Sequence, residues 1–506
     1  MINKSLLAVI LIGTTIPFVS CSTQEPPSGP ATGTLSAPTG PLPAPPRTEA
    51  VSNPQINAYI AGLKYDPRQI LAEQVGNSVI PAQPLPDEVQ DDGKAIVICK
   101  QVKHHLSGNI DDMLILNPTH GVIWPGALVA VDQDLVRGTP APLSLRRAPL
   151  WLSVDLPGIG GRGMFQVDDP SQGTVQAAVD GALDYWNNYK YREGYVSEAR
   201  SQYSATVVYS AEQLAASLGV TYGNFANSIS TQFKMTSSRE SKVAVALFKQ
   251  VFYTVSFNPP SHPGAVFHPS VTLDEVRNEI TGETPAGYVS SVDYGRILML
   301  RIEASADTLD TELKAAVKYG SAKVKASADY QKTLEKSKIT LLTIGGNAEV
   351  NARPVDATRI EDLREAIQGK NALYSKSNPG QPIAYTIRFL KNGRLAKMGY
   401  STDYTEVTYE RQPYGWIAFK HTAPYYAKFY LSWKEGDQAK SWASGRLTHN
   451  WESPQIQLKG NAHDIQIQLQ SYTGFQWVPK FVNLNAPPNK RYASGGTSFY
   501  PSLSAQ

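Results

Sequence analysis

One glycine-rich stretch and a pair of histidines are the first candidates for a cofactor site or a catalytic site in this chain. GIGGRG at 158–163 matches the G-x-G-x-x-G pattern of dinucleotide sites by letter and follows an expected strand. A dinucleotide site needs a helix next, because the helix N-terminus binds the pyrophosphate. The chain instead continues as MFQVDDP, which is extended and contains Pro170. A turn explains this stretch better than a cofactor site.

The other candidate groups lack partners at the spacing that catalysis or metal binding requires. His104 and His105 have no such partners, and we expect them in a solvated loop. The chain contains no H-E-x-x-H, no paired C-x-x-C and no G-x-S-x-G. Asp168 and Asp169 could transfer protons, but VDDP is more typical of a turn. The sequence therefore predicts no catalytic residue, no metal site and no cofactor, and it favours a protein that is not an enzyme.

Length and composition are typical of a globular protein with several domains. The chain has 506 residues, of which 42% are hydrophobic and 18% charged, with a formal net charge of +3. That length suffices for roughly two to four domains. A dedicated nucleic-acid binder would concentrate Lys and Arg, so we expect no nucleic-acid partner. Cys99, the only cysteine besides Cys21, is expected to be a buried thiol without a disulfide.

The N-terminal residues indicate export. MINKSLLAVILIGTTIPFVSC has an early Lys and an apolar run, which predicts a signal peptide over 1–21. FVSC resembles a bacterial lipobox with Cys21 as the lipidated residue; cleavage by ordinary signal peptidase is the alternative. Residues 22–53 are rich in Pro, Gly, Ser and Thr and should form a disordered tether. We expect an outer-membrane or cell-surface lipoprotein, or a secreted protein, that acts at a target-cell membrane.

The rest of the chain is predicted to be mostly β-structure. LWLSVDLPG is typical of a strand, and IRFLKNGRLAKMGY of a hairpin that turns at Asn392-Gly393. A helix is predicted at GTVQAAVDGALDYWNNY, where apolar residues recur at helical spacing from Val175 to Trp186. Crowded tryptophans and alternating strands such as HDIQIQLQSY indicate a β-sandwich over 412–506.

Two segments carry a helical pattern and a strand pattern at once. Residues 212–239 form an apolar helical stripe, yet their apolar residues also alternate on both sides of Gly223-Asn224. Residues 309–332 show the same two patterns about Gly320-Ser321. Each arm beside Gly320-Ser321 is about as long as a membrane-spanning strand, roughly nine to eleven residues.

Strong strand candidates flank both segments. SKVAVALFKQVFYTVS at 241–256 follows the first, VSSVDYGRILMLRIEAS at 289–305 precedes the second, and KITLLTIGG follows it. Two amphipathic surface helices with accidental alternation are the simpler interpretation of either segment alone. A helix that refolds to extend neighbouring strands would satisfy its backbone in lipid only if many copies closed into a barrel. The two segments together therefore favour a pore.

Several stretches resemble one family, the cholesterol-dependent or thiol-activated cytolysins of the membrane-attack-complex/perforin (MACPF/CDC) superfamily. They are WPGALV at 124–129, VDLPG at 154–158, QVDDP, FKQVFYTVS, SSVDYGR at 290–296 and the pair Gly345-Gly346. The resemblance implies an α+β fold of four domains, elongated, with a central bent antiparallel sheet flanked by helix bundles and a C-terminal β-sandwich. The implied domains are 54–200 for the N-terminal parts of domains 1 and 2, 201–250 and 296–370 for the pore-forming domain, 251–295 and 371–411 for the returning segments, and 412–506 for the membrane-binding sandwich.

The same resemblance assigns roles at the subunit interface. Tyr203 matches a strand tyrosine that stacks between subunits in the family, but its expected aromatic partner is Ile339 here. Gly345 and Gly346 match a pair where an edge-covering strand swings away before the next subunit pairs, and glycine has the conformational freedom for that role. An ordinary β-turn is the alternative for the glycine pair.

The implied membrane tip departs from the family. SYTGFQWVPKF at 471–481 aligns with the Trp-rich undecapeptide and keeps Thr473, Gly474 and Trp477, but Tyr472 stands where the cysteine would be. Thiol activation is therefore excluded. The family's Thr-Leu pair for cholesterol aligns with Thr497-Ser498, which loses the apolar member. Aromatic side chains, Phe475 and Phe499 with Trp477, could still anchor in a membrane interface.

The sequence therefore predicts a secreted or lipid-anchored pore-forming toxin that assembles into a ring and inserts two β-hairpins per subunit. Its dependence on cholesterol is expected to be altered or lost. Expected partners are a target membrane lipid, with sterol as one option, or a surface receptor, further copies of the chain, and a companion cytolysin-like subunit. The alternative is a non-lytic surface adhesin that keeps the cytolysin fold.

Overall fold

The chain forms two compact units in the computed structural model. The first contains the residues up to Ile80 and His104–Tyr404, and the second contains Pro81–Lys103 and Thr405–Gln506. The described residues are 53–76, 78–116, 123–221, 241–259, 261–305, 309, 313–314, 337–345, 353–355, 366–484 and 489–506. No helix in these ranges is both long and apolar enough to cross a bilayer.

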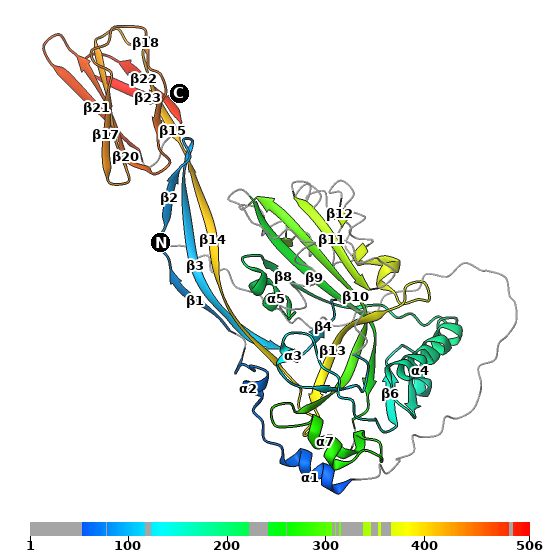
Figure 1. The fold of residues 1–506 in the computed structure, drawn as a ribbon. Coiled ribbons are helices and arrows are strands. Elements are labelled where there is room, and N and C mark those ends of the chain that lie inside the picture. Colours follow the sequence, from blue (N-terminus) through cyan, green and yellow to red (C-terminus); the bar gives the residue numbers. More distant parts are fainter. Residues whose placement is uncertain are drawn as a thin grey trace, which may run out of the picture. The chain divides into compact units, whose positions relative to one another are not determined.

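A ten-stranded sheet forms the centre of the first unit (Figure 1). Its main path runs β12-β11-β10-β9-β6-β7, with β8 paired to β9, β13 and β5 to β10, and β4 to β13. The strands are β4 (Met113–Leu114), β5 (Leu128–Ala130), β6 (Leu150–Val154), β7 (Met164–Val167), β8 (Arg200–Val207), β9 (Ser241–Phe257), β10 (Ala286–Ser305), β11 (Lys338–Gly345), β12 (Arg353–Val355) and β13 (Gln381–Phe389). The strands predicted in LWLSVDLPG, 241–256, 289–305 and KITLLTIGG are confirmed.

The helices of the first unit are short, and α4 (Gln172–Tyr185) is the one predicted from its apolar spacing. Ser171 and Thr174 form a capping box at its start, and Val175, Val179 and Trp186 are buried, so this prediction is confirmed. The others are α1 (Pro54–Gly62), α2 (Pro67–Ile70), α3 (Gln133–Val136), α5 (Ala211–Leu218), α7 (Leu273–Glu279), the 3-10 turns η1 (Gly160–Gly163), η3 (Pro263–Val266) and η5 (Gly369–Ala372), and the π-helical turn η2 (Trp186–Lys190).

GIGGRG ends in the 3-10 turn η1 and is followed by strand β7, which confirms a turn in place of a nucleotide-binding helix.

A smaller sheet contains β1 (Ser78–Pro84), β2 (Glu88–Asp91), β3 (Ala95–Ile110) and β14 (Met398–Pro413). It corrects the prediction for His104 and His105, which lie within β3 and not in a loop. The His104 ring stacks on Tyr404 with centroids 5.0 Å apart, and His105 Nδ1 lies 2.7 Å from Asp403. These ring and carboxylate contacts across the strands hold both histidines in the sheet. Cys99, also in β3, is buried as predicted.

The hairpin predicted about Asn392-Gly393 is only partly correct. The chain does turn there, with Gly393 at a φ of 68°, which favours glycine. The two arms are joined by an isolated bridge from Arg388 to Leu395 and by backbone hydrogen bonds from the N–H of Phe389 to Arg394 and from the N–H of Ala396 to Ile387, at 2.8 and 2.9 Å. Beyond these contacts β14 leaves to pair with β3, because β13 is already bonded to β10 and β4.

The C-terminal residues form the predicted β-sandwich. One sheet has the order β18-β15-β22-β23 with β19 on β15, and the other β17-β16-β20-β21 (Figure 1). Phe419 and Phe429 stack with ring centroids 4.8 Å apart in its core. The strands are β15 (Gly415–His421), β16 (Ala427–Glu435), β17 (Gln438–Ala443), β18 (Trp451–Glu452), β19 (Ile456–Leu458), β20 (Ala462–Tyr472), β21 (Trp477–Leu484), β22 (Lys490–Gly496) and β23 (Pro501–Ala505).

Candidate functional site

β8, β9, β10 and β11 each have one end at the same border of the central sheet. We call this border, where the strands end, the strand edge. β8 finishes at Val207, which lies opposite Ala244 near the start of β9. Ser241, the first residue of β9, pairs with Ser305, the last residue of β10. β11 begins at Lys338, which lies opposite Glu303 of β10. The two segments with dual patterns, 212–239 and 309–332, therefore leave the sheet and return to it at the same edge.

Helix α5 is fixed by its caps and by packing on the sheet. Ser210 Oγ accepts a hydrogen bond from the backbone N–H of Gln213 at 3.0 Å, and Gly219 ends the helix with a φ of 71°. Leu214 and Leu218 are buried in one apolar cluster with alternate residues of β9, such as Val245. The helical prediction for 212–239 is confirmed as far as Leu218. Its predicted turn, Gly223-Asn224, lies outside the described residues.

The second dual-pattern segment begins on the other face of the sheet. Leu309 is helical and buried, in a cluster with Ala244, Phe248 and Ile302, and Leu313 is helical and packs at its border. Since Val245 and Ala244 are neighbours on β9, the two clusters occupy opposite faces. From Val243 to Phe248, β9 is apolar on both faces because each face is covered there. The predicted turn at Gly320-Ser321 lies outside the described residues.

Glycines lie where neighbouring strands of the central sheet approach one another closely. A Cβ on Gly295 would lie 1.9 Å from the carbonyl oxygen of Gln250, and one on Gly345 would lie 2.7 Å from the carbonyl oxygen of Gly295. Gly345 also has a φ of +81°, which L side chains rarely adopt. These close approaches therefore exclude a side chain at Gly295 and at Gly345. Gly346 lies outside the described residues, and the hinge role of the pair stays a prediction.

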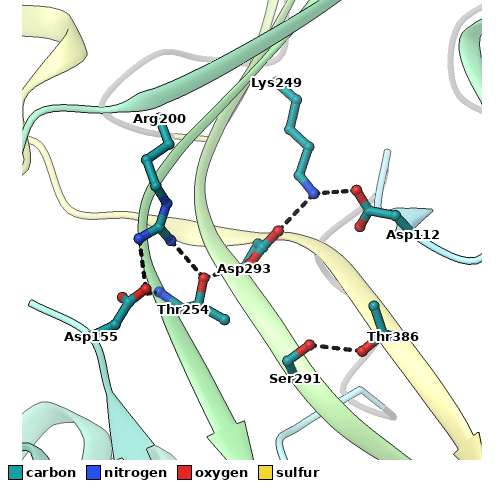
Figure 2. A network of polar contacts seen from close by, with 8 residues as sticks. All are labelled: Asp112, Asp155, Arg200, Lys249, Thr254, Ser291, Asp293 and Thr386. Atoms are coloured by element: carbon teal, nitrogen blue, oxygen red, sulfur yellow. Dashed lines mark hydrogen bonds and ion pairs between the residues drawn. The ribbon is translucent and has the colours of Figure 1, made fainter. Parts of the chain in front are cut away.

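A buried lysine joins β9, β10 and the residues just before β4 (Figure 2). Lys249 Nζ lies 2.5 Å from Asp112 Oδ2 and 2.6 Å from Asp293 Oδ2, and only 7% of its side chain is exposed. Burial raises the pKa of the Asp112 carboxyl, and the attraction of Lys249 opposes this effect. Two carboxylates thus compensate one buried ammonium.

A second branch extends this network to β8 and to the residue after β6 (Figure 2). Thr254 Oγ1 donates to Asp293 Oδ1 at 2.7 Å and accepts from Arg200 Nη2 at 2.7 Å. Arg200 also donates to Asp155 at 2.6 Å, and Asp155 accepts from the backbone N–H of Thr254 at 2.6 Å. The resulting chain of contacts ties β8, β9 and β10 together at the end opposite the strand edge described above.

The other face of the sheet carries a polar cluster at the same level. Arg296, only 5% exposed, donates from Nε to Gln250 Oε1 at 2.7 Å, and Gln250 Nε2 donates to the carbonyl oxygen of Ile367 at 2.7 Å. Burial lowers the pKa of Arg296 to about 10, which leaves the guanidinium charged at neutral pH. Polar contacts on both faces of the sheet therefore fix β9 and β10 near Lys249 and Arg296. The helical segments are held by apolar contacts instead.

The two predicted interface residues, Tyr203 and Ile339, lie on different strands of the sheet, one on each side of the β9–β10 pair. Tyr203 is 58% exposed on β8, with its ring 6.1 Å from that of Phe248. Ile339 on β11 is buried and paired with Ile302 on one side and Val355 of β12 on the other. β9 and β10 separate the two strands. A contact between Tyr203 and residue 339 would therefore have to join two subunits.

The predicted tip residues come together at one end of the sandwich. Thr473 Oγ1 accepts from the backbone N–H of Gln476 at 3.1 Å, which closes the loop that contains Gly474 and Phe475. Thr497 Oγ1 accepts in the same way from the N–H of Tyr500 at 3.2 Å, which closes the loop with Ser498 and Phe499. Ser471 Oγ donates to the carbonyl oxygen of Ser498 at 2.7 Å and joins the two loops. The loops hold Phe475 and Phe499 out in solvent.

The tip also contains residues that the sequence did not single out. Tyr426 and Arg446 belong to two further loops, and the Arg446 guanidinium lies 4.0 Å over the Tyr426 ring. Lys428 Nζ lies 4.3 Å over the ring of Trp477. Tyr500 is 83% exposed beside Phe499. The absence of carboxylates from these stretches of sequence was the signal that could have drawn attention to them.

A buried histidine, His421, lies beneath the tip loops and contacts two of the segments that carry them. His421 Nδ1 accepts from the Ser494 hydroxyl and its Nε2–H donates to the Tyr425 carbonyl, both at 2.7 Å. Burial lowers the pKa of His421, so the ring is neutral at pH 7. The arrangement ties the start of one tip loop to β22 and is structural. In the described ranges, no group of three His, Cys, Asp or Glu side chains could hold a metal ion.

Helical residues lie between β8 and β9 and between β10 and β11, and the C-terminal residues form a separate sandwich. This combination is the architecture of the cytolysins. Two family models match the chain: thiol-activated cytolysin over residues 55–412 and thiol-activated cytolysin beta sandwich domain over residues 416–502. The chain belongs to the thiol-activated cytolysin family, whose members are pore-forming toxins and not enzymes.

Individual proteins agree with this assignment. Tetanolysin of Clostridium tetani is 32% identical over 474 residues, which cover 89% of this chain and 88% of tetanolysin. The crystal structure of listeriolysin O aligns with a TM-score of 0.77 at 26% identity, covering 90% of this chain and 95% of that one. A non-hemolytic pneumolysin from Streptococcus pneumoniae strain ST306 aligns with a TM-score of 0.74 at 27% identity, covering 90% and 99%.

Proposed function

We propose that this chain assembles into a ring on a target membrane and inserts two β-hairpins per subunit to form a pore. The observation that carries the proposal is the shared edge at Val207, Ser241, Ser305 and Lys338, from which both dual-pattern segments leave. A segment that unfolds there continues the strands on either side of it. Barrel closure by many subunits would then satisfy every backbone group in lipid.

Subunit pairing in the ring would use the two sides of the central sheet. β8 presents Tyr203 at one side, and on the other side the described residues of β12 pair with β11 at Ile339–Val355, Thr340–Pro354 and Leu341–Arg353. Such a short strand costs little to displace. Gly345, with its positive φ, is the last residue of β11, four residues beyond Leu341, and would absorb the backbone change as β12 moves away.

The proposed target is a membrane that the chain recognises with altered or lost dependence on cholesterol. Tyr472 replaces the cysteine of the family's undecapeptide, and Thr497 is followed by Ser498 in place of an apolar residue. A hydroxyl at residue 498 offers little apolar surface for a sterol ring. A membrane lipid or a surface receptor is therefore the proposed first contact, with a companion cytolysin-like subunit as a further partner.

The proposed route to that membrane is export. Residues 1–21 have the pattern of a signal peptide, Cys21 ends a lipobox-like FVSC, and 22–53 would form the tether of a lipid-anchored or secreted protein. We retain the four-domain division at residues 54, 201, 251, 296, 371 and 412 as part of this proposal.

A non-lytic adhesin with the same fold is the second candidate. Ile339 favours it, since an aliphatic side chain that is 2% exposed cannot stack on Tyr203 of a neighbour. The pneumolysin of this fold from Streptococcus pneumoniae strain ST306 is non-hemolytic. An adhesin would bind membranes without releasing their contents.

Vesicles that vary in sterol and headgroup test the proposed function when binding and dye release are scored separately. A pore former should release dye from at least one bound composition, and release should not require cholesterol strictly. Binding without release on every composition would support the adhesin. Release confined to cholesterol-containing vesicles would overturn the proposal for the tip.

A further inference from the structure

Two cations and three aromatic rings form a continuous row of contacts across the tip of the sandwich. The order is Tyr426, Arg446, Tyr472, Trp477 and Lys428, which we call the cation–aromatic ladder. Arg446 lies 4.0 Å from the Tyr426 ring and 5.7 Å from the Tyr472 ring. Tyr472 and Trp477 have centroids 5.2 Å apart, and Lys428 lies 4.3 Å over Trp477. All these separations are within the range of direct ring contact.

Strand pairing places the members of the ladder at one end of the unit. Ala427 pairs with Ser471 of β20 and bridges to Leu447, and the Tyr472 N–H donates to the Tyr426 carbonyl at 2.9 Å. Phe475, Phe499 and Tyr500 project from the same end with 92%, 59% and 83% of their surface exposed. The ladder is therefore flanked by aromatic side chains that lack cover within the described chain.

The charge of this end has one sign. Residues 421–428, 444–450, 471–481 and 494–501 contain Lys428, Arg446 and Lys480 but no Asp or Glu. Neither Lys428 nor Arg446 has a carboxylate within 4.0 Å among the described residues. Aromatic contact fixes the position of each cation and leaves its charge uncompensated, so an anion can take the open side.

We propose that the cation–aromatic ladder binds the anionic headgroups of phospholipids while Phe475, Phe499 and Tyr500 enter the bilayer interface. The guanidinium of Arg446 matches a phosphate or carboxylate through two N–H groups, and Lys428 adds a point charge. Exposed aromatic rings beside the cations favour a lipid surface over a soluble acidic glycan. This inference rests on the proposed membrane-contacting function and names the lipid class that this function would use.

Vesicle binding by the full chain tests the proposal, with phosphatidylcholine alone, with phosphatidylserine, and with phosphatidylglycerol. The chain should bind both anionic vesicles more tightly than neutral ones, and added salt should weaken the binding. The pair Lys428→Gln and Arg446→Gln should lose roughly 25-fold in affinity for anionic vesicles, from about fivefold for each cation near a charged surface.

Matched variants separate the ladder from net charge. Lys434→Gln with Lys440→Gln removes the same charge at the opposite end of β16 and β17 and should leave affinity nearly unchanged. Lys428→Arg with Arg446→Lys keeps both cations and should retain binding, which also checks that the tip folds. An equal loss in both Gln pairs would overturn the proposal, because net charge alone would then account for binding.

Two further results would also overturn the proposal: equal binding to neutral vesicles, and binding to ganglioside vesicles but not to phosphatidylserine vesicles of the same surface charge. Dye release is measured on the same vesicles. Release that ignores headgroup charge would remove the ladder's role and leave pore formation standing. Binding to anionic vesicles without release would support the ladder and argue against pore formation.

Discussion

Cross-linking residue 206 to residue 213 should abolish dye release, and reduction of the cross-link should restore it. In the folded chain, Gln213 Nε2 donates to Thr206 Oγ1 at 3.1 Å, so the two side chains touch where α5 follows β8. If α5 extends β8 as a strand, the same two positions become separated by about 23 Å, at roughly 3.3 Å per residue. A short link cannot span that length.

Thr206→Cys with Gln213→Cys, joined by a short bis-thiosulfonate reagent, provides the measurement. The background carries Cys21→Ser and Cys99→Ala, which remove the other cysteines of the chain. The linked protein should bind vesicles and release no more dye than vesicles without protein. Full release by the linked protein would show that α5 stays helical during function.

A disulfide between β8 and β9 is the matched control. Ala205 and Ala246 are direct partners in the antiparallel pair, so Ala205→Cys with Ala246→Cys joins strands that remain neighbours in both states. Dye release should continue with this disulfide closed. Loss of release in the control as well would mean that any covalent restraint in the sheet blocks the process, and the interpretation of the first cross-link would fail.

Lys249→Met should lower the free energy of local opening of β9 and β10 by about 3 kcal/mol, because it leaves two carboxylates without their shared cation. Asp112 and Asp293 lie 2.5 and 2.6 Å from the ammonium, which is 7% exposed. Methionine has nearly the same length, so lost charge and not lost volume causes the effect. Hydrogen exchange of the β9 and β10 amides measures it without requiring the whole chain to unfold in one step.

Asp112→Asn is the control for this substitution. Burial already raises the pKa of the Asp112 carboxyl, and Asp293 still compensates Lys249 when the other carboxylate is gone. The change in opening free energy should therefore stay below about 1 kcal/mol. Equal effects of Asp112→Asn and Lys249→Met would contradict a lysine shared between two carboxylates.

Local periodicity predicted β6, β9, β10 and β11 of the central sheet and the presence of a C-terminal sandwich. The apolar spacing from Val175 to Trp186 predicted α4, and alternation in HDIQIQLQSY predicted β20. The helical stripe of 212–239 predicted α5 because its apolar face packs on a sheet. Predictions from local sequence failed where distant parts of the chain pair. His104 and His105 were predicted in a loop because their contacts, Tyr404 and Asp403, come from a distant part of the sequence.

The candidate site was less accessible from sequence for the same reason. Loop sequences and the family resemblance pointed to Phe475, Trp477 and Phe499. The Lys249 network was not predicted, since Asp112, Lys249 and Asp293 are far apart in sequence and meet only when β9, β10 and the residues before β4 pack together. The cation–aromatic ladder likewise depends on loops brought together by strand pairing.

A fluorescence scan along residues 313–319 tests most directly whether the segment that follows β10, helical at Leu309 and Leu313, becomes a membrane-spanning strand. Single cysteines at each position carry an environment-sensitive dye, and emission is compared before and after binding to vesicles that show release. We expect a blue shift at the alternate positions 313, 315, 317 and 319 but not at 314, 316 and 318, as a strand with one face in lipid requires. Shifts that recur every three to four residues, or none at all while dye is released, would contradict it.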